Sequence, residues 1–208
     1  MPKFVLIGGG DISLGETANI DRFTISLIGN ENPNILFFPT AAHDNVEYAN
    51  LFREYYLSLG CSETNSCFVQ KENTVDILEK IRKAEIIYLG GGQTSLLINL
   101  FDKKKLVSAL KEFSMEGKVI VGMSAGAIAL GETALLSELD EQEEVFGHSW
   151  GLIPETICVP HYQQKYQNKI DRFRERYPGQ NILTIKEKQA YFIETSGTKI
   201  IKRILIND

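Results

Sequence analysis

The chain has 208 residues, of which 43% are hydrophobic and 24% are charged, and its formal net charge is −5. This composition is ordinary for a globular protein and predicts a single domain over residues 1–208. The acidic balance argues against nucleic acid as a partner, and no apolar stretch approaches the roughly 18 residues that a membrane span requires.

Short apolar runs that end at turn residues alternate with segments whose apolar residues recur at helical spacing. In chain order, the first part is expected to contain strand Lys3–Ile7, helix Thr17–Ile28, strand Ile35–Phe38, helix Val46–Leu59, strand Thr64–Val69, helix Thr74–Arg82, strand Glu85–Leu89, and helices Thr94–Phe101 and Leu106–Glu116. This alternation predicts an α/β fold of three layers, with a mostly parallel sheet and helices on both of its faces.

The second part of the chain begins with the same pattern and then loses it. Strand Lys118–Val121 is followed by the tight turn Gly122–Gly126 and by a helix over Ala125–Leu130. The acidic segment Glu132–Glu144 is expected to be a loop or a short helix. The remaining expected elements are strand Ile157–Val159, helix Tyr166–Tyr177, and the short closing strands Ile182–Ile185, Ala190–Glu194 and Lys199–Ile204.

Neither a leader nor a metal site is indicated. The first residues, MPKFVLIGGGD, lack the longer apolar region of a secretory signal, so a cytoplasmic location is expected. The three cysteines include no C-x-x-C pair, and the three histidines lie far apart without an H-E-x-x-H motif. We therefore expect no disulfide framework, no metal and no cofactor.

The clearest chemical signal is the segment Gly122–Met123–Ser124–Ala125–Gly126, which fits G-x-S-x-G where a strand meets a helix. A nucleophile elbow needs small residues there, because the turn is strained and the helix lies close to the strand. The turn would raise the Ser124 hydroxyl above the carboxyl ends of the strands. The alternative interpretation is a glycine-rich turn without a catalytic role.

A serine hydroxyl is a weak nucleophile and needs a positioned base. His161 is the best candidate, because it follows the expected strand Ile157–Val159 and Pro160 stiffens the approach to it. His43 and His148 are rivals in less defined segments. A third group should orient the imidazole, and the acidic segment Glu138–Glu144 offers several carboxylates without indicating which one.

A second glycine-rich turn, Gly90–Gly91–Gly92, follows another expected strand. Backbone N–H groups there could donate to an oxyanion together with the N–H of Ala125. A dinucleotide loop is disfavoured, because G-x-G-x-x-G would require glycine where Ser95 stands. The glycines at positions 8–10 fail the same test at Ser13.

Taken together, these segments resemble the dipeptidase E and cyanophycinase family of serine peptidases. The resemblance rests on Gly90–Thr94, on Gly122–Gly126, on Pro160–Tyr162 and on Phe38–Ala42, and it covers nearly the whole chain in order. It implies a fold like that of class I glutamine amidotransferases, with serine in place of their cysteine.

The resemblance also assigns roles to residues. It implies Ser124 as nucleophile, His161 as base, and an oxyanion hole near Gly91 and Ala125. The family's acid is expected not far past the serine, which makes Asp140 the first choice. Dipeptidase E prefers an N-terminal aspartate, which implies a facing basic side chain. Expected helix Tyr166–Tyr177 supplies three arginines, but no motif matches any of them to that role.

The expected activity is hydrolysis of short peptides, with a small peptide as partner and with neither nucleic acid nor membrane. Ser124 would attack the carbonyl and His161 would carry the proton. Two alternatives stay open from the sequence. The first is a ligand-binding protein on the same fold without catalysis, and the second is an amidase acting on small amides. The oligomeric state is also left open.

Overall fold

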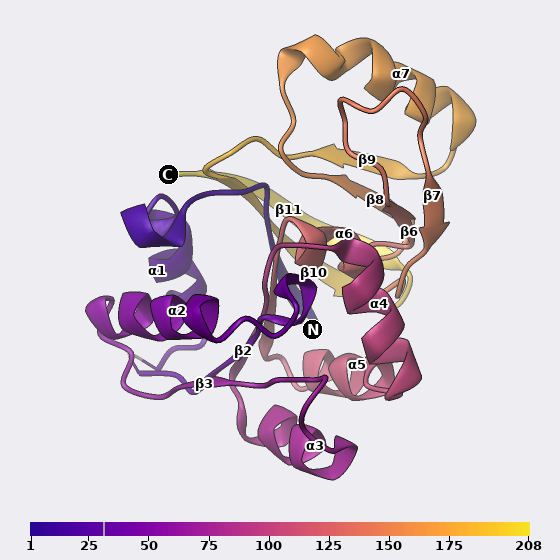
Figure 1. The fold of residues 1–208 in the computed structure, drawn as a ribbon. Coiled ribbons are helices and arrows are strands. Elements are labelled where there is room, and N and C mark those ends of the chain that lie inside the picture. Colours follow the sequence, from indigo (N-terminus) through magenta and orange to yellow (C-terminus); the bar gives the residue numbers. More distant parts are fainter. Residues whose placement is uncertain (31) are drawn as a thin grey trace.

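The computed structural model describes residues 1–30 and 32–208, and a seven-stranded sheet lies at its centre (Figure 1). The order of strands across this sheet is β11-β10-β1-β5-β4-β2-β3. Its members are β1 (Lys3–Ile7), β2 (Ile35–Phe38), β3 (Thr64–Ser66), β4 (Ile86–Leu89), β5 (Val119–Met123), β10 (Gln189–Ser196) and β11 (Lys199–Asn207).

Five of these strands are parallel neighbours: β1 pairs with β5, β5 with β4, β4 with β2, and β2 with β3. The sequences of β2, β4 and β5 are nearly continuous apolar runs, and every residue of each is buried. A strand can be apolar on both sides only where both faces of the sheet are covered.

Helices provide that cover. The α-helices of the described residues are α1 (Ala18–Ser26), α2 (Val46–Ser58), α3 (Thr74–Lys83), α4 (Thr94–Lys103), α5 (Val107–Met115), α6 (Ala125–Leu130) and α7 (Gln167–Arg176). Helices α1 and α2 share one apolar core with one face of the sheet, and α3–α6 share a second core with the opposite face (Figure 1). The predicted three-layer α/β fold with a mostly parallel sheet is confirmed.

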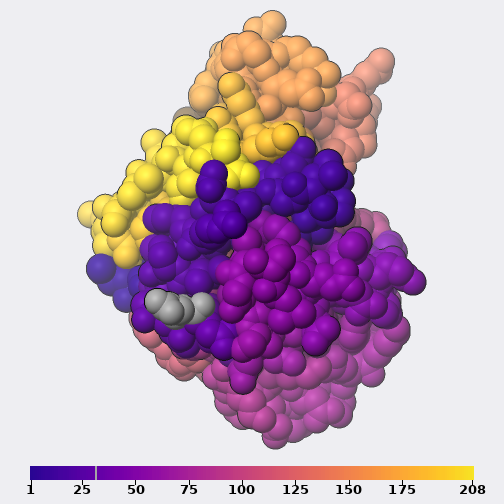
Figure 2. All heavy atoms as spheres, turned by 90° about the vertical axis from the view of Figure 1, so that its left-hand side faces the viewer, coloured from indigo at the N-terminus to yellow at the C-terminus, as the bar shows by residue number. Residues whose placement is uncertain are grey.

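Strands β10 and β11 form an antiparallel hairpin that extends the sheet beyond β1. This pairing brings the C-terminal residues, yellow in Figure 2, against the indigo N-terminal segment. Asp208 also accepts a hydrogen bond from the N–H of Asn19 at 2.6 Å. The two ends of the chain are therefore parts of one structural unit.

The remaining strands make two small sheets beside the central one. β8 (Thr156–Val159) pairs in parallel with β9 (Asn181–Thr184), and α7 connects them and packs on a third apolar cluster. β6 (Thr133–Leu135) pairs with β7 (Phe146–His148) as a hairpin. The expectation of a loop or short helix over Glu132–Glu144 was thus wrong at its start, where β6 forms. Short 3-10 turns cover Ile12–Leu14, Thr40–Ala42 and Gln164–Tyr166.

The register of the central strands determines where chemistry can occur. Ile7 pairs with Met123 and Leu89 pairs with Gly122, so strands β1, β5 and β4 end side by side at one edge. The loops that follow them are therefore neighbours, as expected at the carboxyl edge of a parallel sheet. Within residues 1–30 and 32–208, every helix is too short or too polar to traverse a lipid bilayer.

Candidate active site

Ser124 is the single residue between strand β5 and helix α6, and its backbone has φ of 50° and ψ of −108°. A non-glycine residue rarely adopts positive φ, so this backbone conformation is strained. The N–H of Ser124 donates to the carbonyl of Ile7 at 3.0 Å, which ties the turn to the end of β1. The side chain is consequently held at the carboxyl edge of the sheet.

The glycines on either side of this turn are required by close packing. A Cβ on Gly122 would lie 2.5 Å from the carbonyl carbon of Gly126, and a Cβ on Gly126 would lie 2.2 Å from the carbonyl oxygen of Leu89. Each neighbour is backbone and cannot move aside. The G-x-S-x-G spacing is therefore the condition for α6 to pack against β4 and β5.

His161 follows β8 and meets Ser124, with 2.7 Å between its Nε2 and the serine Oγ. Strand β8 is not a neighbour of β5 in the central sheet. A loop contact achieves the approach instead: the N–H of His161 donates to the carbonyl of Gly8 at 3.0 Å. The structure thus brings together the two residues that the sequence predicted as nucleophile and base.

The other nitrogen of the imidazole contacts Glu187. Glu187 lies in the turn between β9 and β10, and its Oε1 is hydrogen-bonded to His161 Nδ1. When Nδ1–H donates to that carboxylate, the lone pair of Nε2 is left to accept the proton of the Ser124 hydroxyl. The arrangement fixes the tautomer that a general base requires.

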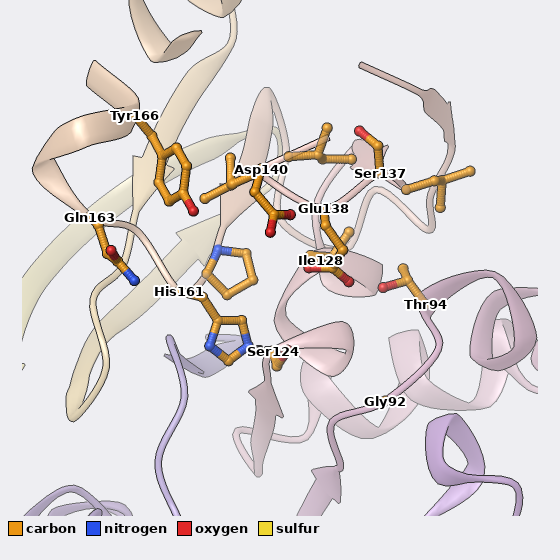
Figure 3. Close-up of a pocket in the computed structure, with 14 residues that line it drawn as sticks. Gly92, Thr94, Ser124, Ile128, Ser137, Glu138, Asp140, His161, Gln163 and Tyr166 are labelled. Carbon is orange, nitrogen blue, oxygen red and sulfur yellow. Dashed lines mark hydrogen bonds between the residues drawn. The ribbon is translucent and has the colours of Figure 1, made fainter. Parts of the chain in front are cut away.

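Asp140, predicted as the acid that orients the histidine, is not at this position. It lines the cavity over Ser124 (Figure 3). Glu187, not Asp140, contacts His161 Nδ1. The physical reason is that the β8–β9 sheet turns the chain back toward β1, and this delivers residue 187 rather than residue 140. The sequence carried one signal for it: an acid in the turn between two expected strands, Ile182–Ile185 and Ala190–Glu194.

Gly9 makes room for the histidine and the glutamate together. A Cβ on Gly9 would lie 2.3 Å from Glu187 Oε2 and 2.7 Å from His161 Cε1. The N–H of Lys188 also donates to the carbonyl of Gly9 at 3.0 Å. The glycine run after β1, which the sequence identified only as not being a nucleotide loop, forms the floor beneath this pair.

The two residues expected near an oxyanion also lie at the serine. A Cβ on Gly91 would be 3.5 Å from the Cβ of Ser124, and Ala125 directly follows Ser124 at the start of α6. Both backbone segments thus lie beside Ser124, and Gly92, the residue after Gly91, lines the cavity above it.

A cavity of about 200 Å³ opens over Ser124 and His161 (Figure 3). Its walls come from the Gly92–Thr94 turn, from the loop between β6 and β7, and from Gln163 and Tyr166 before α7. None of the arginines of α7 lines it, and Arg172 instead pairs with Glu144 at 3.0 Å. The described residues include no group of three His, Cys, Asp or Glu side chains arranged to hold a metal ion.

A buried carboxylate on α1 is linked through Thr17 to the glycine run beside the catalytic residues. Asp21 of α1 accepts hydrogen bonds from Thr17 Oγ1 at 2.8 Å, Tyr55 at 2.8 Å and Tyr56 at 2.7 Å. Burial raises the pKa of Asp21 to about 6, against the opposing effect of these hydroxyl donors. Thr17 in turn touches the glycine run, because a Cβ on Gly10 would lie 2.8 Å from its Cγ2.

Serine hydrolases are the class of protein in which a serine on a strand–helix turn meets a histidine, and the histidine a carboxylate, at the carboxyl edge of an α/β sheet. Comparison with known proteins narrows the class. The sequence model of peptidase family S51 matches residues 4–201, and the chain belongs to this family. It is thus a serine peptidase acting on short peptides.

Individual relatives agree with this assignment. The chain is 28% identical over 163 residues to the uncharacterized peptidase YgaJ of Bacillus subtilis, covering 78% of this chain and 69% of YgaJ. It is 24% identical over 172 residues to a cyanophycinase of Synechococcus elongatus, covering 77% and 53% respectively. A crystal structure of a putative peptidase E protein from Listeria monocytogenes superposes with a TM-score of 0.74 at 19% identity, covering 100% of this chain and 98% of that one. The resemblance stated from the sequence is confirmed.

Proposed function

We propose that the chain hydrolyses peptide bonds through an acyl-enzyme formed on Ser124, with His161 as general base and Glu187 as the group that orients His161. The observation that carries this proposal is the 2.7 Å separation between Ser124 Oγ and His161 Nε2. That distance is within the range required for proton transfer from a nucleophile to its base. The strained conformation of Ser124 supports its interpretation as a nucleophile elbow.

In the first half of the reaction, Ser124 Oγ attacks the substrate carbonyl carbon while its proton passes to His161 Nε2. The imidazolium that forms lies beside the carboxylate of Glu187, which stabilises its positive charge. His161 then gives the proton to the leaving amine as the C–N bond breaks. Water attacks the ester in the second half, and the same histidine accepts its proton. His161 then returns the proton to Ser124 Oγ as the bond to the acyl carbon breaks and the carboxylic acid leaves.

The negative charge that develops on the carbonyl oxygen needs donors. The backbone N–H groups of Gly91 and Ala125 are proposed for this role, because Gly91 lies against Ser124 and Ala125 directly follows it. Preorganised donors of this kind contribute about 10²–10³-fold each to the rate in serine hydrolases. Glycine at position 91 keeps the approach to this space free of a side chain.

Labelling with an uncharged fluorophosphonate, followed by mass spectrometry of the modified peptide, tests the proposal. We expect labelling at Ser124, its absence in Ser124→Ala, and a strong decrease in His161→Ala. Peptide hydrolysis should fall by roughly 10⁴-fold or more in Ser124→Ala. Hydrolysis at an undiminished rate in that variant would disprove the assignment.

We further propose a cytoplasmic location. The three cysteines, Cys61, Cys67 and Cys158, are buried and free. Free thiols agree with a reducing compartment. Fractionation of the source cells tests this location. The marker is peptide hydrolysis that is present in cells with the wild-type protein and absent in cells that carry Ser124→Ala.

A further inference from the structure

The loop between β6 and β7 carries two acidic side chains into the wall of the catalytic cavity. Glu138 and Asp140 both line this cavity, and Figure 3 shows their carboxylates directed toward the space above Ser124 and His161. Among the described residues that line this cavity they are the only carboxylates, and neither lysine nor arginine is among the lining residues. The site therefore presents negative charge to whatever enters it.

Neither carboxylate forms a direct ion pair within the part of the chain that the structure describes. Across residues 1–30 and 32–208, no lysine, arginine or histidine lies within ion-pair distance of either carboxylate. Glu144, in the same loop but outside the cavity, is paired with Arg172 and lies 4.0 Å from Lys169. The two acids over the nucleophile are thus the ones left available to a ligand.

The loop is held in place by a buried lysine. Lys169 of α7 is only 9% exposed, and its Nζ donates to the carbonyls of Leu139 at 3.3 Å and Glu141 at 2.7 Å. These two carbonyls flank Asp140 on either side. Burying an ammonium is costly unless it is hydrogen-bonded, so the contact fixes the backbone from which the acids project.

We propose that Glu138 and Asp140 determine specificity by selecting short peptides that carry a positive charge next to the scissile bond. This inference rests on the proposed function of Ser124. The group recognised is an ammonium or a guanidinium, which is a free α-amino group or a lysine or arginine side chain on the residue that acylates Ser124. A substrate with an aspartate there would be repelled by the same two carboxylates.

Four dipeptide substrates test this inference by chromatographic assay of kcat/KM: Lys-Leu, norleucine-Leu, Asp-Leu and acetyl-Lys-Leu. We expect kcat/KM for Lys-Leu to exceed that for Asp-Leu by tenfold or more, because the two carboxylates attract a substrate ammonium and repel a substrate carboxylate. The double variant Glu138→Gln/Asp140→Asn should reduce that ratio by about tenfold. Glu143→Gln is the matched control, since Glu143 lies in the same loop but does not line the cavity.

The other two substrates identify the source of the charge. A decrease with acetyl-Lys-Leu alone assigns the α-amino group, and a decrease with norleucine-Leu alone assigns the side chain. Equal rates for Lys-Leu, norleucine-Leu and acetyl-Lys-Leu would overturn the inference. So would faster cleavage of Asp-Leu, or a double variant that lowers the rates of all four substrates equally.

Failure of the inference can be distinguished from failure of the proposed function. The uncharged fluorophosphonate reports Ser124 reactivity without a charged group, so the double variant should be labelled at the wild-type rate. Labelled, active enzyme without charge preference removes the inference alone. Hydrolysis that persists in Ser124→Ala removes the proposed function. Raising the ionic strength should also weaken the preference for Lys-Leu, since Glu138 and Asp140 are exposed and salt screens their charges.

Discussion

Gly9 and Glu187 are so close that the glycine has no space for a side chain: its Cβ would lie 2.3 Å from the carboxylate oxygen Oε2. Gly9→Ala should therefore push Glu187 away from His161 and lower kcat/KM by about 10²-fold, the order of loss that a small misplacement of a catalytic group can cause. Steady-state hydrolysis of a dipeptide measures the effect.

Gly10→Ala is the control for that variant. Gly10 has φ of 150°, close to the 152° of Gly9, so the backbone strain is matched. A Cβ at Gly10 would meet Thr17 instead of the catalytic pair. Equal loss of activity in both variants would mean that strain in the loop, and not displacement of Glu187, is responsible.

Ser124 and its strained backbone predict a conflict between activity and stability. Ser124→Gly should abolish hydrolysis and raise the free energy of unfolding by roughly 1 kcal/mol, because glycine adopts φ of 50° without the penalty. Ser124→Ala should abolish hydrolysis without that gain, since it keeps the Cβ. Chemical denaturation of the three proteins compares them, and equal stability of the Gly and Ala variants would argue against strain at the turn.

The two acids near the histidine are expected to differ in effect. Glu187→Gln should reduce both peptide hydrolysis and fluorophosphonate labelling by about 10²–10⁴-fold, because the amide favours the wrong tautomer and leaves the imidazolium without its counter-charge. Asp140→Asn should leave the labelling rate within about twofold of wild type. Wild-type labelling in Glu187→Gln would remove the role given to Glu187.

Asp21 predicts a pH dependence of stability. Its pKa is about 6 in the folded protein and near the ordinary aspartate value of 3.8 when unfolded, so the folded state binds the proton more tightly. The stabilising contribution is present below about pH 4 and is lost as pH rises through about 6, by roughly 2–3 kcal/mol in total. Asp21→Asn should flatten this part of the profile. Thermal or urea unfolding between pH 4 and 7 gives the comparison, and parallel profiles would contradict the assignment.

The sequence was most informative where burial is complete. Strands Lys3–Ile7 and Ile35–Phe38 were predicted with their observed bounds, because both faces of each are covered and every position after Lys3 in them is buried and apolar. The turn at Ser124 was predictable for a related reason, because its glycines are dictated by close backbone contacts. Gly122 packs on Gly126 within the same strand–helix unit, and Gly126 packs on Leu89 of the adjacent strand β4. Backbone constraints of this kind produce a motif that can be recognised in the sequence.

The elements and residues that were missed depend on contacts distant in sequence. Strands β6 and β7 have three residues each, which is too short for a period of two to stand out in an acidic segment. Glu187 reaches His161 only because β9 pairs with β8 and β10 pairs with β1. His161 and Glu187 are 26 residues apart, and no spacing pattern along the chain predicts that they come into contact.

The antiparallel pairing of β10 with β1 also has a consequence for biosynthesis. A ribosome releases the serine and the histidine well before residue 187, and the turn that carries Glu187 is anchored only when β10 aligns along β1. The proposed triad is therefore incomplete in the growing polypeptide. Hydrolytic activity should begin only after β10 has paired with β1, so that folding delays the appearance of a protease until the residues of β10 have also been translated.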